Sequence, residues 1–248
     1  KKGFIGSQSV TKPSLRIDVN RFEPEAKLFG VDTIILNNGV QDPSLMRQCL
    51  TYERFAAAGL ASPRCNFARV AVNGEDLGVY AHVEPIKPGF LRHHFGRDDG
   101  LLYEGNYTSD FSRHHLGAFE PKYAAKQAPF DALVQIADDL RSEGGLTEVL
   151  NQHFDAPQVL DYLAMEWITG HTDGYAGHTN NYFLYQLPQS GRFRFVPWGV
   201  DTTMQGQRIH DGPYDQGVLA KHIVADPVWR VALERRARNL MAQVWVPQ

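Results

Sequence analysis

Apolar and polar residues follow two different periods along this chain. In the first third they alternate, as in residues 15–19, and a period of two is typical of half-buried strands. Turn-forming residues separate the alternating runs, and Asn73-Gly74-Glu75-Asp76 predicts the turn of a hairpin. The strands expected in this part of the chain cover residues 15–19, 31–36, 67–72 and 78–83.

One helix is expected among these strands. Asp42 suits the N-cap, Pro43 suits the first helical position, and Gly59 suits the position just after the helix. Apolar or small residues recur between them with helical spacing, at positions 45, 49, 52 and 56. We therefore predict that this helix begins directly after Asp42.

The middle of the chain carries weaker signals. Pro85, Pro88 and Gly89 interrupt the pattern and mark a boundary between two lobes. Residues 100–104 favour one more short strand. Residues 108–127 are polar, rich in histidine and without a clear period, so we expect a long loop there.

Helical spacing dominates the rest of the chain. Helices are expected over residues 130–141 and 155–170, and Asp226-Pro227 opens a last helix. Residues 182–186 and 193–198 alternate around a turn and predict a second hairpin. In the last helix, four residues are expected to face inward: Val228, Val231, Leu240 and Met241.

Together these patterns predict an α+β fold. Its small strand-rich N-terminal lobe covers residues 1–88, and its larger helix-rich C-terminal lobe covers residues 89–248. The 248 residues are 43% hydrophobic and 21% charged, which is ordinary for a globular protein and excludes a disordered chain. The formal net charge of −3 argues against a nucleic-acid partner.

Membrane and redox signals are few. No apolar run approaches the roughly 18–20 residues that span a bilayer, so no membrane span is expected. The apolar stretch near Phe4 is too short and too broken for a signal peptide. Cys49 lies on the apolar face of a predicted helix, which favours a buried thiol, and a disulfide with Cys65 stays open.

Residues 171–181 differ from the rest of the chain. This segment between a helix and a hairpin contains Asp173, two histidines, Asn180 and Asn181, and Asp201 follows where the hairpin ends. Phosphoryl-transfer enzymes of the kinase kind need such a set. One Asp orients the acceptor hydroxyl, while an Asn and a second Asp hold Mg²⁺ on the phosphates.

Other interpretations of these residues stay open. Asp and Asn are common turn formers, so Asp173 and Asp201 could each cap a local turn. The histidines suggest a zinc site, but adjacent pairs such as His93-His94 cannot readily share one metal, and no helical HxxxH spacing is present. The Asn106-Tyr107-Thr108 sequon is too short a pattern to be specific.

Five segments, in the same order, resemble the CotH family of atypical, protein-kinase-like enzymes. The resemblance runs from about Gly6 to Gly206. It is carried by these segments: Lys12-Pro-Ser-Leu-Arg-Ile; Leu36-Asn-Asn with Asp42-Pro-Ser-Leu-Met-Arg; Val72-Asn-Gly-Glu with Leu77-Gly-Val-Tyr and Glu84; Asp173 with Asn180-Asn181-Tyr-Phe-Leu-Tyr; and Phe195-Val-Pro-Trp198 with Asp201.

The resemblance implies a two-lobed protein-kinase-like fold and transfer of phosphate from ATP, with Mg²⁺ or Mn²⁺, to Ser or Thr of a protein substrate. By position in the motifs, Asp173 is then the catalytic Asp, and Asp201 with Asn180 or Asn181 holds the metal. Lys12 approaches the nucleotide phosphates, and Glu84 pairs with Lys12 or orders the nucleotide site.

The chain departs from the family pattern in three places. Gly199 stands where the family has the first Asp of Trp-Asp-x-Asp, and Met204-Gln205 replaces a Phe-Gly pair. The early Arg-Gly-x-Ser stretch appears as Ile5-Gly6-Ser7-Gln8-Ser9, without its basic residue. These differences keep one alternative open: an inactive, pseudokinase-like binding module of a coat, envelope or extracellular assembly. Transfer of AMP in place of phosphate is a further alternative, because the same residues would serve it.

Overall fold

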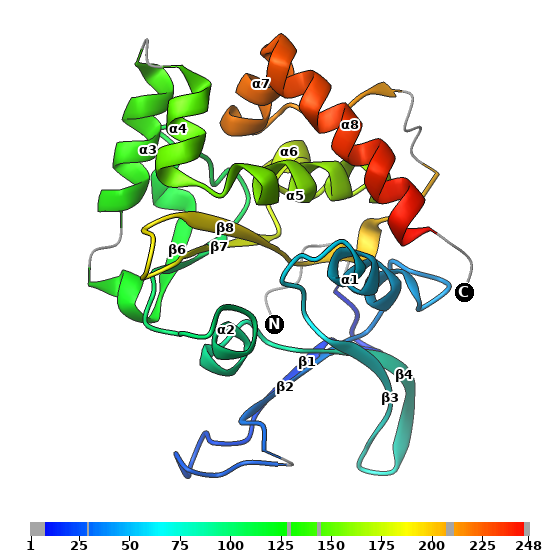
Figure 1. Ribbon diagram of the computed structural model, residues 1–248. Coiled ribbons are helices and arrows are strands. Elements are labelled where there is room, and N and C mark those ends of the chain that lie inside the picture. Colours follow the sequence, from blue (N-terminus) through cyan, green and yellow to red (C-terminus); the bar gives the residue numbers. More distant parts are fainter. Residues whose placement is uncertain (1–7, 29, 128–129, 143–144, 207–210, 246–248) are drawn as a thin grey trace.

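The α+β class is confirmed by a computed structural model, which describes residues 8–28, 30–127, 130–142, 145–206 and 211–245. These residues form two four-stranded antiparallel sheets, which lie in separate regions of the molecule with most helices packed over the second (Figure 1). Residues 5–7 of the early stretch, which lacks the family's basic residue, lie outside the described residues.

The first sheet has the strand order β1-β2-β4-β3. Its strands are β1 (Leu15–Asp18), β2 (Thr33–Asn37), β3 (Cys65–Val72) and β4 (Glu75–Val83). Asn73 and Gly74 both have positive φ, as the predicted tight turn between β3 and β4 requires. β4 begins three residues earlier than expected, because an irregularity between Val70 and Ala71 lets pairing continue past Gly78.

Helix α1 (Arg47–Ala57) packs against this sheet, but the predicted start after Asp42 is wrong. The Asp42 carboxylate instead accepts the backbone N–H groups of Ser44 and Arg47, which closes a turn before the helix. Leu45 has a φ of 58°, which is incompatible with a helix. The Asp42 side chain therefore closes a turn and does not cap the helix start that its residue type predicted.

The two cysteines form a disulfide, so the favoured interpretation of Cys49 as a free buried thiol is wrong. Cys49 lies on α1 and Cys65 begins β3, with their Cα atoms 5.0 Å apart. Sequence spacing could not decide this pairing, because it depends on how the helix packs across the sheet.

The second sheet has the order β6-β5-β7-β8. It consists of β5 (Leu102–Gly105), β6 (Phe119–Lys122), β7 (Tyr182–Gln186) and β8 (Phe193–Pro197). The hairpin of β7 and β8 agrees with the prediction. The long loop expected over residues 108–127 is wrong, because it contains β6 between the short 3₁₀ helices η2 (Leu116–Ala118) and η3 (Tyr123–Lys126). The long-range pairing of β6 with β5 leaves no local period to read.

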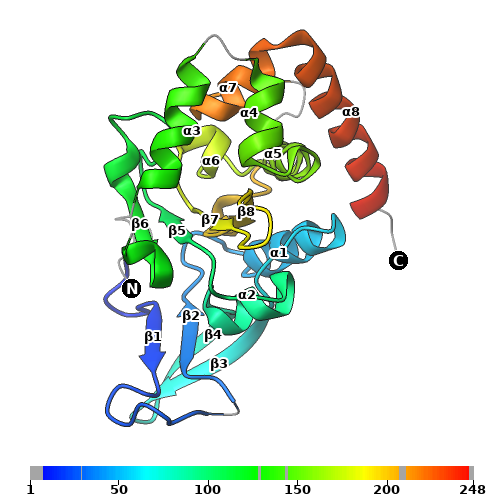
Figure 2. The ribbon, with the colours of Figure 1, turned by 60° about the vertical axis from the view of Figure 1, so that its left-hand side comes forward.

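Five helices cover this sheet on the side away from the first sheet (Figures 1 and 2). They are α3 (Asp131–Arg141), α4 (Leu146–His153), α5 (Ala156–Thr169), α7 (Val218–Ala225) and α8 (Pro227–Val244). The Asp226 cap of α8 is confirmed, since its side chain accepts the N–H groups of Val228 and Trp229. Val228 and Val231 nevertheless point to solvent, and the buried stripe of α8 is Leu233, Ala237, Leu240 and Val244.

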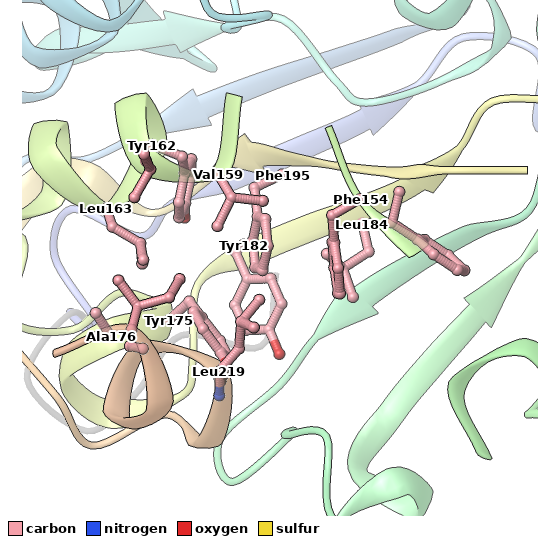
Figure 3. Packing of buried hydrophobic residues seen from close by; sticks show 14 of the residues in the cluster. Phe154, Val159, Tyr162, Leu163, Tyr175, Ala176, Tyr182, Leu184, Phe195 and Leu219 are labelled. Atoms are coloured by element: carbon pink, nitrogen blue, oxygen red, sulfur yellow. Dashed lines mark hydrogen bonds between the residues drawn. The ribbon is translucent and has the colours of Figure 1, made fainter. Parts of the chain in front are cut away.

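The main core lies between α5 and the second sheet and is rich in aromatic rings (Figure 3). Tyr162 from α5 stacks on Phe195 from β8 at 4.9 Å between centroids, and Tyr175 and Tyr182 pack beside them. Offset and edge-to-face contacts of this kind stabilise a core beyond the area that they bury. This rigid core carries the segment that holds Asp173.

The two sheets are joined through α2 (Pro88–Phe95) and through a small apolar cluster. In that cluster Tyr52 of α1 meets Val83 of β4 and Val200, which follows β8. The expected break at Pro88 is the start of α2. The lobe boundary between residues 88 and 89 stays a prediction. None of the helices within the described residues is long and apolar enough to cross a membrane.

Candidate functional site

The end of α5 sets the position of the predicted site segment. Gly170 ends the helix with a φ of 69°, which turns the chain sharply and leads into residues 171–181. Within this segment a single helical turn, α6 (Tyr175–His178), follows Asp173 and Gly174. Thr179 and Asn181 both have positive φ, so the backbone turns again before β7 begins.

These turns bring Asp173 and the two asparagines together. The Oδ1 atom of Asp173 accepts Nδ2 of Asn180 at 3.1 Å, and its Oδ2 atom accepts Nδ2 of Asn181 at 2.5 Å. Nδ1 of His178 lies 3.6 Å from the same carboxylate. Because both amides donate their NH₂ groups to Asp173, their oxygen atoms remain available to accept a donor or to bind a cation.

Asp201 follows the end of the second hairpin, two residues after Gly199. It lies in the 3₁₀ helix η4 (Val200–Thr202) and is partly exposed. The N–H of Trp198 donates to the carbonyl of Asn181 at 3.2 Å, which ties the two segments together. A Cβ atom on Gly199 would lie 2.6 Å from Cγ of Asn181, so the absence of a side chain at 199 lets the Asn181 amide sit there.

Helix α1 supports η4 from the other sheet. The hydroxyls of Thr51 and Thr203 are 2.6 Å apart, and Thr203 also donates to the carbonyl of Val200. Tyr52 is buried beside Asp201, and burial together with that negative charge raises the pKa of the Tyr52 phenol far above its usual value. Sequence reasoning gave none of these three residues a role, because each looks like an ordinary core position.

The structure does not bring Lys12 and Glu84 together as a pair. The Lys12 ammonium lies 5.1 Å from the ring centroid of Tyr80. Tyr80 alternates along β4 with Ala81, which packs under α1, so Lys12 lies against the face of the sheet away from α1. Glu84 is instead bound by Arg64, through both carboxylate oxygens.

The ion pair explains the ionisation of Glu84. Burial raises the pKa of its carboxyl group, but hydrogen bonds and the charge of Arg64 outweigh burial and bring the pKa below its usual value. Glu84 therefore remains charged at pH 7 and lies at the end of β4, close to the chain that leads into α2.

Glu166 is a residue that sequence reasoning missed. It is fully buried on α5, and its two oxygens accept the N–H groups of Tyr175 and Ala176 at 2.8 Å each. Burial raises the pKa of this carboxyl group to about 7, although the two N–H groups favour its charged form. A signal was present: Glu166 stands alone as an acidic residue within the apolar run Leu163–Ile168.

The histidines that the structure describes do not form a zinc site. His171 is fully buried, and desolvation lowers its pKa to about 4, so its ring is neutral at pH 7. Among the residues that the structure describes, no group of three or more His, Cys, Asp or Glu side chains could hold a metal ion.

The oxygen atoms of Asp173, Asn180, Asn181 and Asp201 nevertheless suit one kind of cation. Carboxylate and amide oxygens are hard ligands, and Mg²⁺ keeps several waters and binds substrate phosphates besides one or two carboxylates. A set of two carboxylates with two amides therefore fits Mg²⁺ or Mn²⁺ brought in with a polyphosphate, and does not fit a zinc ion bound by protein alone.

Comparison with known families shows which class of protein has this α+β fold and this loop. The family model described as CotH kinase protein matches residues 2–244, nearly the whole chain. The protein therefore belongs to the CotH family, as the motif resemblance indicated.

Its relatives are spore coat proteins and fungal homologues. The chain is 29% identical to the inner spore coat protein H of Bacillus subtilis (strain 168) over 192 residues, which cover 73% of this chain and 52% of that protein. It is 28% identical to the inner spore coat protein H-like protein of the same organism, over 97% of this chain and 74% of that protein. Spore coat protein homolog 1 of Rhizopus delemar is 25% identical over 66% of this chain and 29% of its own length. The chain thus spans about half the length of inner spore coat protein H.

Proposed function

We propose that this protein transfers the γ-phosphate of ATP to a Ser or Thr hydroxyl of a protein substrate, in a two-lobed protein-kinase-like fold. The contact of Asp173 with Asn180 and Asn181, next to the segment that bears Asp201, carries the proposal. It gathers, from two separate elements, the acceptor-orienting carboxylate and the oxygen ligands that this chemistry needs.

Each residue has a distinct part in the proposed reaction. Asp173 accepts the hydrogen bond of the acceptor hydroxyl and takes its proton as the new O–P bond forms. Asp201 and the amide oxygens of Asn180 and Asn181 would hold the metal, which would supply neutralisation of the charge on the phosphates. The bond between the γ-phosphorus and its bridging oxygen breaks, and ADP leaves with that electron pair.

The fixed geometry of the loop supports this assignment. Two amide donors restrain the Asp173 carboxylate, one at each oxygen, and the side chain is partly exposed, so it is held in place and can still be reached. Positioning and electrostatic stabilisation supply most of the catalysis in phosphoryl transfer, because the protein has little covalent chemistry to perform.

The proposal is tested by calorimetric titration of ATP with Mg²⁺, and then with Mn²⁺, into the wild-type chain and Asp201→Ala. We expect metal-dependent binding to the wild type, and loss of both binding and phosphate transfer in the variant at unchanged fold. Asp215→Ala, an exposed Asp outside the site, is the matched control. Full activity of Asp201→Ala would contradict the assigned role.

Two observations favour a second function. Gly199 lacks the family's carboxylate, and Lys12 and Glu84 have separate partners, Tyr80 and Arg64. A chain with these features can serve as a binding module without phosphate transfer. Absence of nucleotide binding by the folded wild type, at millimolar ATP with either metal, would select this function. Mass spectrometry of a labelled product would separate transfer of phosphate from transfer of AMP.

For this protein, the names of its relatives favour association with a coat. Three of the relatives are named as spore coat proteins or their homologues. The Cys49–Cys65 disulfide agrees with an oxidising compartment, where such bonds persist. We therefore propose a coat, envelope or secreted location and a protein substrate within the same assembly.

A further inference from the structure

Glu166 is a charged group in an apolar place. It lies on α5 with no exposed surface, and the rings of Tyr162, Tyr175 and Tyr182 pack around this part of the core (Figure 3). Burying a carboxylate is costly unless hydrogen bonds compensate. Its compensation includes two backbone N–H groups, those of Tyr175 and Ala176, at 2.8 Å each.

These two N–H groups belong to the first turn of α6, directly after Asp173 and Gly174. The main chain of Glu166 binds the other side of the same segment, because its carbonyl accepts the N–H of His171 at 2.8 Å. The N–H of Asn180 in turn donates to the carbonyl of Gly174 at 3.2 Å. One residue of α5 thus holds the backbone on both sides of Asp173.

Gly174 shows how close this approach is. A Cβ atom at that position would overlap with Oε1 of Glu166 and would lie 2.6 Å from Cδ2 of His171. Glycine is the residue type that permits a backbone to come this near to a buried side chain. The sequence therefore carries two matched features, a lone acidic residue in an apolar helix and a glycine eight residues later.

We propose that Glu166 is the positioning residue of the site: its buried carboxylate fixes the backbone of residues 174–176 and thereby the orientation of Asp173 and Asn180. This inference deepens the proposed function and rests on it. Glu166 touches neither nucleotide nor acceptor in this scheme and acts only through the loop.

Among the ionisable groups packed around this part of the core, Glu166 is the one whose charge changes near neutral pH. Tyr162 on α5, Tyr175 on α6 and Tyr182 on β7 keep their protons at pH 7, because burial raises their pKa values. Burial also raises the pKa of Tyr214, in the segment before α7, and lowers that of His171 on the site loop. Loss of the negative charge of Glu166 removes one acceptor from the two N–H groups that it holds.

The test compares Glu166→Gln with a matched variant on the same helix. Asp161→Asn also replaces a carboxylate on α5 by an amide, but Asp161 pairs with Arg236 of α8, away from the loop. In Glu166→Gln we expect the turnover number for ATP consumption to fall about 10- to 100-fold, with the Kd for Mg-ATP within about threefold of wild type. We expect Asp161→Asn to lose stability and to keep its turnover number.

The pH profile supplies a readout that a merely structural role would not move. Wild-type turnover should rise as pH increases through the ionisation of Glu166, and this limb should be missing in Glu166→Gln and present in Asp161→Asn. Gly174→Ala is the second variant, since its Cβ displaces the same carboxylate while leaving Glu166 in place. It should lower turnover as Glu166→Gln does.

The outcomes separate the inference from the proposed function. A wild type that binds and consumes ATP, with Glu166→Gln within twofold of Asp161→Asn, overturns the positioning role alone. A wild type that binds no nucleotide overturns the proposed function. In that case, hydrogen exchange at the Tyr175 and Ala176 amides tests whether Glu166 holds the backbone of the loop. Faster exchange in Glu166→Gln than in Asp161→Asn supports the hold on the loop, and equal exchange overturns it.

Discussion

At Gly199 the backbone has a φ of 55°, and the position of a missing Cβ is 2.6 Å from Cγ of Asn181. Both facts favour glycine, since an L-residue with a side chain is strained in the left-handed region and would also push the amide away. Gly199 therefore suits the place that the Asn181 amide occupies in this chain.

Gly199→Ala should separate these two effects when it is compared with Gly191→Ala. Gly191 has a φ of 69° and open space around its Cβ position, so its variant carries only the backbone strain of about 1–2 kcal/mol. Gly199→Ala should lose a further ~1–3 kcal/mol of unfolding free energy from the overlap, and should weaken Mg-ATP binding. Urea unfolding and calorimetry measure both quantities. Equal losses in the two variants would contradict the packing argument.

At the scale of elements, α1 connects the first sheet with the site. Its disulfide fixes Cys49 to the first residue of β3, and its next turn presents Thr51 and Tyr52 to the segment that bears Asp201. A helix held at one end by a covalent bond and contacting η4 at the next turn can transmit the position of one element to the other. The amphipathic pattern predicted the helix, but not these two connections.

Reduction of the disulfide should destabilise the chain. The bond closes a loop over a sequence separation of 16 residues, and closing a loop of that size is worth about 3 kcal/mol. Wild type refolded in a thiol reductant should therefore unfold at lower urea concentration than the oxidised protein. The double variant Cys49→Ser/Cys65→Ser should match the reduced wild type and should not respond to reductant. A midpoint that reductant leaves unchanged in the wild type would show that the bond adds no stability.

At the scale of the whole molecule, two buried ionisable groups give opposite responses to pH. His171 has a folded-state pKa of about 4, below that of the unfolded chain, so the unfolded state binds its proton first as pH falls and stability is lost between about pH 6.5 and 4. Glu166 has a folded-state pKa of about 7, above its unfolded value, so the folded state binds its proton first and stability is gained as pH falls from about 7 to 4.5.

Because the two windows overlap, we expect their contributions, on the order of 3 kcal/mol each, to cancel largely in the wild type. Removing one group should uncover the other. His171→Gln should gain stability on acidification from pH 7 to 4.5, and Glu166→Gln should lose it from pH 6.5 to 4. The control is His114→Gln, which changes an exposed histidine outside the site loop and should follow the wild type. Urea unfolding at several pH values measures the slopes, and identical slopes in the three variants would contradict the assignment.

The sequence by itself determined the class of fold, most elements and the residues of the site loop. Alternation and helical spacing act over a few neighbours, and so do turn signals such as Asn73-Gly74 and caps such as Asp226, which the structure confirms. The ordered motifs around Asp173 and Asp201 gave the family, which the family model also gives.

Only the tertiary structure decided what depends on distant parts of the chain. Strand β6 exists because β5 lies beside it, the Cys49–Cys65 bond exists because α1 crosses β3, and α8 faces inward with Leu233 and not with Val228. Glu166 could be noticed in the sequence, but its hold on the backbone after Asp173 appears only when α5 and α6 are packed together. The physical reason is common to all four: each contact joins residues that local spacing cannot relate, and packing and long-range hydrogen bonds select it.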